Sequence, residues 1–236
     1  MAKDFFGNEE VKTKKRGKVK NGPIGRIFRT LGFLLVLVAS LFLVVINVRR
    51  MDVSFINGFM SGVYSFFDTT FVNTGDYIYS ALAVGLLLLV WTQSNSIFMR
   101  VITTVLGAFA LIGLSYASPD ANNKILFFSL GNKIGDFYNN LFGKFTWLEM
   151  VLSLVPLLFA YLILAFKRPE RISSRLVSSG LLILLIGVVG VYLPVITTAT
   201  WASNSTVLVI VYGVLSISYL LTALGSVFGV LGLLRK

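Results

Sequence analysis

The chain has 236 residues, of which 56% are hydrophobic and only 13% are charged. Soluble domains carry about 25% charged residues. Here the charges are dense in the first 29 residues and missing from long stretches that follow. This composition excludes an ordinary soluble domain and indicates an integral membrane protein.

The sequence contains no histidine and no cysteine. Their absence excludes disulfides, thiolate or imidazole metal ligands, cysteine nucleophiles and histidine bases. The glycines are dispersed along apolar stretches and form neither a phosphate-binding loop nor a dinucleotide fingerprint. The sequence therefore predicts no cofactor and no metal site.

Residues 1–29 are polar and basic, and we expect them to form a cytoplasmic tail. Gly22, Pro23 and Gly25 disfavour a stable helix there. We interpret the basic residues of the tail first as a topology signal. Contact with lipid headgroups or an acidic partner is the alternative. Nucleic acid is disfavoured because no aromatic residue that could stack on bases lies within the cluster Lys12–Lys20. The candidate contact residues are Lys12, Lys14, Lys15, Arg16, Lys18 and Lys20.

Residues 30–236 are predicted to form one all-α transmembrane domain of about six spans. Thr30–Val48 is free of charge and long enough to cross a hydrocarbon core of about 30 Å. Leu176–Leu234 is also uncharged, and it is too long for one crossing. Pro194 and the polar residues 197–206 divide it into a fifth and a sixth span. The other predicted spans are Tyr77–Met99, Val101–Pro119 and Met150–Phe166.

Two further segments have the apolar periodicity of amphipathic helices. In Val53–Val72 the repeating residues are Ile56, Phe59, Met60, Val63, Phe67 and Phe71. In Asp120–Lys144 and just beyond it they are Ile134, Phe137, Tyr138, Leu141, Phe142 and Phe145. Each segment is predicted to lie flat in the membrane interface or to re-enter it part-way.

The distribution of basic residues predicts the orientation. Six spans place the tail, Arg100, the Lys167–Arg175 turn and the C-terminal pair on one side, and these hold most of the 21 basic residues. The positive-inside rule then puts both termini in the cytoplasm and both amphipathic segments on the outer face. Arg49 and Arg50 are the exceptions. We expect a bacterial or archaeal cytoplasmic membrane; in a eukaryotic source, Asn204 would begin a glycosylation sequon.

An internal duplication would explain the order of parts in residues 53–119 and 125–194. Gly58 and Gly62 match Gly131 and Gly135, and Arg100 with Pro119 matches Arg175 with Pro194. Few other residues are identical between the two segments. The competing explanation is that any two helical hairpins would share this order of parts without a duplication.

Three GxxxG patterns are candidate helix contacts, because small residues four positions apart let helix backbones approach closely. They are Gly225 with Gly229, which continues to Gly232, then Gly58 with Gly62, and Gly131 with Gly135. The first pattern lies within a span and favours helix packing. For the two outer patterns, a bend or local flexibility is an equal alternative.

No acidic residue falls within a predicted span, and Glu149, at the mouth of the fourth, is the nearest. An ionisable group deep in the bilayer is the usual sign of proton or ion coupling. Its absence disfavours a coupled transporter and an intramembrane acid–base enzyme, including a lipid-modifying one. The chain is therefore predicted not to be an enzyme.

The basic tail, the paired spans and the outer-face helices together resemble the membrane module of septal DNA translocases. The resemblance covers the spans only and implies an architecture, since this sequence shows no motor domain. The favoured hypothesis is a non-enzymatic membrane subunit or scaffold of a larger assembly, of secretion, DNA-transfer or envelope type. Its partners would be lipids, other membrane subunits or further copies of the chain. The alternative is a small-solute channel or facilitator formed by a homo-oligomer.

Overall fold

The computed structural model describes residues 22–70, 75–93, 97–98, 100–105, 146–167, 171–197 and 205–234. The regular structure of these residues is helical, without strands. The all-helical prediction is therefore confirmed for this part of the chain. Residues 1–21, most of the predicted third span and the whole second amphipathic segment lie outside it.

Helix α1 runs from Pro23 to Arg50 and starts inside the segment expected to be a non-helical tail. Pro23 occupies the first helical position, where a fixed φ suits the helix and an N–H is not needed. The N–H of Arg26 donates to the carbonyl of Gly22 at 3.2 Å. The glycine and proline therefore begin the helix here and do not prevent it.

A tight turn separates α1 from helix α2, Ser54–Thr70. Asp52 has a φ of 50°, in the left-handed region that commonly ends helices and that Asp tolerates better than most residues. The N–H of Asp52 donates to the carbonyl of Arg49 at 3.2 Å. Helix α2 covers most of the predicted amphipathic segment Val53–Val72.

The remaining long helices are α3, Gly75–Gln93, α6, Thr146–Lys167, α7, Arg171–Thr197, and α8, Ser205–Leu234. Helix α3 ends six residues before the predicted end of the second span. Helix α6 continues through Pro156 and α7 through Pro194, which membrane helices tolerate because neighbouring groups and local adjustments satisfy the freed carbonyl. The uncharged stretch Leu176–Leu234 is therefore divided into two helices at its polar residues 197–206 and not at Pro194.

Three of these helices are long and apolar enough to cross a membrane: Pro23–Arg50, Ile172–Gly190 and Thr206–Leu234. Ala81–Thr92 and Leu157–Phe166 are shorter apolar helices. These findings support a membrane protein with transmembrane helices.

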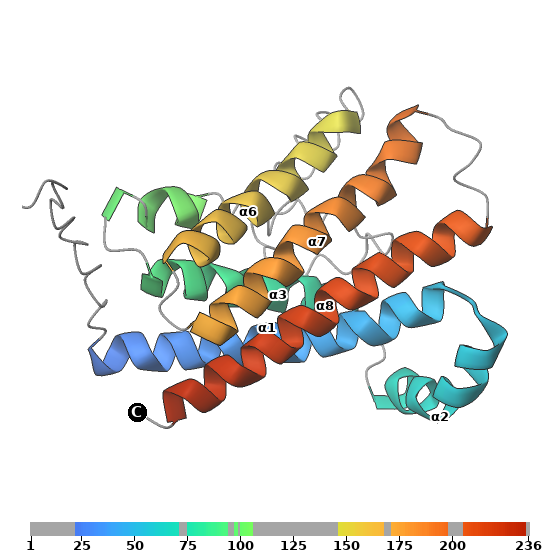
Figure 1. Ribbon diagram of the computed structural model, residues 1–236, viewed down its shortest axis with the longest axis horizontal. Helices are drawn as coiled ribbons and strands as arrows, with labels where there is room; N and C mark the ends of the chain where they lie inside the picture. Colours follow the sequence, from blue (N-terminus) through green and yellow to red (C-terminus); the bar gives the residue numbers. More distant parts are fainter. Residues whose placement is uncertain are drawn as a thin grey trace, which may run out of the picture.

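Five helices close into a ring in the order α1, α3, α6, α7, α8 and back to α1. One apolar core fills the ring and draws large side chains from every member, for example Phe33, Leu89, Leu164, Leu181 and Tyr219. Helix α2 projects from the side of this ring, and α1 is the one described helix that its backbone approaches closely (Figure 1).

The helices of the ring run along the bundle in two opposite directions. Helices α1 and α7 begin at the end where α3, α6 and α8 finish, as Figure 1 shows. Arg26, Arg29 and Arg175 therefore belong to one end. Arg49 and Arg50, the last residues of α1, belong to the other.

Candidate functional site

The GxxxG pair of α8 lies where the helix touches two neighbours. The β-carbon of an alanine at Gly225 would lie 2.7 Å from the backbone nitrogen of Val177 in α7. An alanine at Gly229 would place its β-carbon 2.6 Å from the ring of Phe33 in α1. Gly225 and Gly229 thus face different helices, and Gly232 follows in the last turns of α8.

The contact between α7 and α8 extends further than the glycine pattern indicated. Ser218 Oγ of α8 donates to the carbonyl of Gly180 in α7 at 2.8 Å. A side chain at Gly180 would collide with Thr222 Oγ1 and would approach the carbonyl of Ser218 to 2.8 Å. We call these five residues, Val177, Gly180, Ser218, Thr222 and Gly225, the α7–α8 seam.

Gly180, Ser218 and Thr222 belong to no GxxxG pattern, so the glycine patterns did not indicate them. A signal for the seam was present, because Ser218, Thr222 and Ser226 repeat at the four-residue spacing of small residues in membrane helix contacts. In the structure all three are almost fully buried.

A second close approach joins α1 to α3. An alanine at Gly85 would place its β-carbon 3.0 Å from the carbonyl oxygen of Gly32, and one at Gly32 would lie 3.1 Å from the carbonyl oxygen of Gly85. The two backbones therefore cross with glycine on both sides. These isolated glycines match no GxxxG pattern, so no periodic signal indicated this contact.

Other buried hydroxyl groups of α8 bond within their own helix. Ser216, Thr222 and Ser226 donate to the carbonyl four residues earlier, each at 2.8 Å. Ser40, Ser173 and Ser174 are buried, and among the residues that the structure describes their hydroxyls have no hydrogen-bond partner. Their small size still permits close helix approach.

The GxxxG pair of α2 lies in open surroundings. A side chain at Gly58 or Gly62 would meet no atom of the described residues within 4 Å. The third pair, Gly131 and Gly135, the basic residues Lys12–Lys20, and Asn204 lie outside the described residues.

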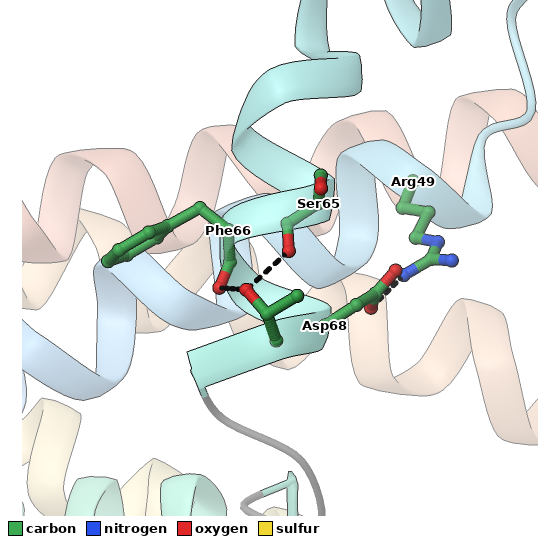
Figure 2. A network of polar contacts seen from close by, with 5 residues as sticks. Arg49, Ser65, Phe66 and Asp68 are labelled. Carbon is green, nitrogen blue, oxygen red and sulfur yellow. Dashed lines mark hydrogen bonds and ion pairs between the residues drawn. The ribbon is translucent and has the colours of Figure 1, made fainter.

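The two arginines that contradict the positive-inside rule both have partners. Arg49 forms a 2.7 Å ion pair with Asp68 of α2 (Figure 2), and its guanidinium lies 5.5 Å from the centre of the Tyr64 ring. Arg50 lies 5.9 Å from the centre of the Tyr212 ring in α8. The ion pair offsets one charge, and both arginines fit the negative end of α1.

The contacts around Arg49 form a polar network that joins the end of α1 to the turn and to α2. Asn57 Nδ2 donates to Asp52 Oδ1 at 3.0 Å, and the Tyr64 hydroxyl donates to Asn57 Oδ1 at 3.5 Å. Burial raises the pKa of Tyr64, and the charge of Arg49 opposes this rise. We call these residues, Arg49, Asp52, Asn57, Tyr64 and Asp68, the α1–α2 corner.

At the other end of the bundle, Arg100 lies 4.9 Å from the centre of the Trp91 ring. An arginine stacked on tryptophan is common where a helix meets the headgroup layer. Among the residues that the structure describes, His, Cys, Asp and Glu form no group that could hold a metal ion. The arrangement is one of helix contacts, with no assembled reaction centre in the described part.

No protein-family model, no curated protein and no solved structure matches the chain.

Proposed function

We propose that the chain is a non-enzymatic integral membrane subunit of a larger membrane-embedded assembly, of secretion, DNA-transfer or envelope type. The observation that carries the proposal is the apolar core that fills the five-helix ring. Phe33, Leu43, Leu89, Leu164 and Leu181 are among its fully buried side chains. Such a core leaves the outer surface of the bundle as the place where this protein meets other molecules.

The filled ring also bears on the channel alternative. A solute path through one protomer needs polar groups that face a common space. In the described part of the ring, Ser216, Thr222 and Ser226 instead donate to carbonyls of their own helix. A channel of this chain would therefore have to run between protomers, and we rank it second.

The outer surface suits an assembly subunit. Apolar side chains are exposed along α1, including Ile27, Leu34 and Leu41, and along α8, including Ile217 and Phe228. In a membrane such faces contact lipid or the helices of partner subunits, which are equally apolar. Close packing within the ring gives these faces a rigid support.

We propose a multi-pass topology of about six spans with both termini in the cytoplasm, in a bacterial or archaeal cytoplasmic membrane. Helices α1, α7 and α8 supply three of the spans, α3 and α6 two, and the predicted span Val101–Pro119 the sixth. The alternating helix directions in Figure 1 agree with this order. The basic end with Arg26, Arg29 and Arg175 would face the cytoplasm, where the tail could contact anionic lipid.

Purification in mild detergent tests the function. We expect a tagged chain to retain other membrane proteins in fixed stoichiometry. A homo-oligomer without partners that conducts small solutes in liposomes would contradict the proposal and establish the channel.

Cysteine labelling tests the orientation, because the native chain has no cysteine. Ile172, which is exposed at the start of α7, is the position chosen on the proposed cytoplasmic side. A membrane-impermeant reagent added to intact cells should label Ser54→Cys at the start of α2 and should not label Ile172→Cys. The reverse pattern would invert the topology.

A further inference from the structure

Helix α2 carries a row of exposed phenylalanines. Phe55 and Phe59 are 86% and 84% exposed, and Phe66 is 57% exposed. Their spacing of four and seven residues puts the three rings on one side of the helix. Gly58 and Gly62 lie on the same side and add no side chain that would cover the rings. We call this side the phenylalanine face.

The other two sides of α2 have different characters. Ile56, Met60 and Phe67 are partly buried, and the Phe67 ring packs edge-on against Phe42 of α1 with ring centres 4.7 Å apart. The third side is polar and exposed, with Ser61, Ser65 and Asp68. The phenylalanine face is therefore bounded by a packed side and by a side suited to water or headgroups.

The contacts with α1 fix how deep α2 reaches. Phe42 precedes Arg49 by two helical turns, a distance of about 10 Å along α1. Helix α2 starts just after the end of α1, and its Phe67 returns to the level of Phe42. If Arg49 and Arg50 mark the headgroup layer, Phe67 lies well inside the apolar part of that leaflet, which is about 15 Å thick.

The size of the phenylalanine face argues against a protein partner held by α2 alone. Three phenylalanine rings at these exposures offer at most a few hundred Å². Stable complexes bury about 800 Å² on each partner. Lipid acyl chains have no such requirement, because each buried ring gains transfer free energy by itself.

We infer that α2 is a wedge seated in the leaflet at the Arg49–Arg50 end of the bundle, with its phenylalanine face among the acyl chains of phospholipids. Ser61 and Ser65 face the headgroups, and Arg50, exposed at the end of α1, complements the charge of the phosphates. The α1–α2 corner holds the wedge at its angle. The inference rests on the membrane topology proposed above and assigns α2 a lipid partner and a depth.

Nitroxide labels on single cysteines test this inference. The full chain would be placed in vesicles of phosphatidylethanolamine and phosphatidylglycerol, with one label at Phe59→Cys, Phe66→Cys or Ser61→Cys. Collisions with oxygen, which concentrates in the acyl region, should exceed collisions with a water-soluble nickel complex at positions 59 and 66. At position 61, on the polar side of the same helix, the order should be reversed.

Leu220→Cys, an exposed position in the middle of α8, separates the two proposals. Oxygen-dominated collisions at 220 with nickel-dominated collisions at 59 and 66 would overturn the wedge and leave the topology standing. Nickel-dominated collisions at all of these positions would overturn both. Spin–spin broadening from a label at Phe59→Cys would also overturn the wedge, because it would place a second copy of the chain against this face.

Discussion

The two described GxxxG pairs have the same spacing and opposite surroundings. Gly225 and Gly229 of α8 each face a neighbouring helix at less than van der Waals distance for an added β-carbon. Gly58 and Gly62 of α2 face none of the other described residues within that distance. The spacing of the glycines therefore permits a close contact without creating one. The contact exists where the facing helix is also held in place, as α7 is held against α8 by the rest of the ring.

The helices around these two glycine pairs are also held together by different interactions. The α7–α8 seam relies on backbone approach and on a buried interhelical hydrogen bond from Ser218 to Gly180. The α1–α2 corner relies on exposed polar contacts, chiefly Arg49 with Asp68. Exposed ion pairs contribute little and are screened by salt, so the corner should open far more easily than the seam.

The largest effect is expected from Gly225→Ala. The new β-carbon would lie 2.7 Å from the Val177 nitrogen, and a backbone atom cannot move aside without shifting α7. Such overpacking costs about 1–3 kcal/mol. We expect the midpoint of thermal unfolding in detergent to fall accordingly. A midpoint equal to or above that of the native chain would mean that the seam is looser than described.

Removing the interhelical hydrogen bond should have a smaller effect. Ser218→Ala should lower the free energy of unfolding by about 0.6 kcal/mol, a typical value for hydrogen bonds between membrane helices. Ser216→Ala is the matched control, because the Ser216 hydroxyl donates to the Tyr212 carbonyl within α8. Equal losses in chemical unfolding of the two variants would show that Ser218 contributes nothing between helices.

The corner should respond locally. Asp68→Asn removes the charge that pairs with Arg49 and should cost less than about 1 kcal/mol. We expect faster amide hydrogen exchange in α2 and no change in the seam. Added salt should reduce the difference between the variant and the native chain. Unchanged exchange in α2 would show that Asp68 does not hold the corner.

The smallest effect on the whole fold is expected from Gly58→Ala, the same substitution made at the open glycine pair. In the part of the chain that the structure describes, nothing lies within 4 Å of the new atom, and alanine favours a helix by about 0.5–1 kcal/mol over glycine. Hydrogen exchange in α2 should slow slightly while the unfolding midpoint stays constant. A loss of stability comparable to that of Gly225→Ala would remove the distinction between the two pairs.

The sequence predicted the helices better than the contacts between them. Charge-free length located α1, α7 and α8, and the spacing of Phe59, Met60, Val63 and Phe67 located α2. These signals are local, since each depends on the solvent around one segment. The partners of Arg49 and Arg50 depended on where Asp68 and Tyr212 come to lie, and no property of the arginines indicates that.

The start of α1 shows a second limit. Pro23 and Gly25 occur in turns and at helix starts alike, and only the bond from Arg26 to Gly22 distinguishes the two. Gly32 and Gly85 show a third limit. Where two helices cross once, each needs only one glycine at the crossing, so neither helix has a periodic pattern that could be recognised. The sequence thus limits which faces can pack, and the assembled fold decides which do.

The closure of the ring by α1 and α8 affects how the protein is made. The Phe33 ring lies against Gly229, so one wall of the pocket around Phe33 is synthesised long after Phe33 itself. Translation adds roughly 5–20 residues per second, which separates α1 from the completion of α8 by roughly 10–40 s. During that time the face of α1 that will pack on α8 needs a temporary cover from lipid, the insertion machinery or a chaperone.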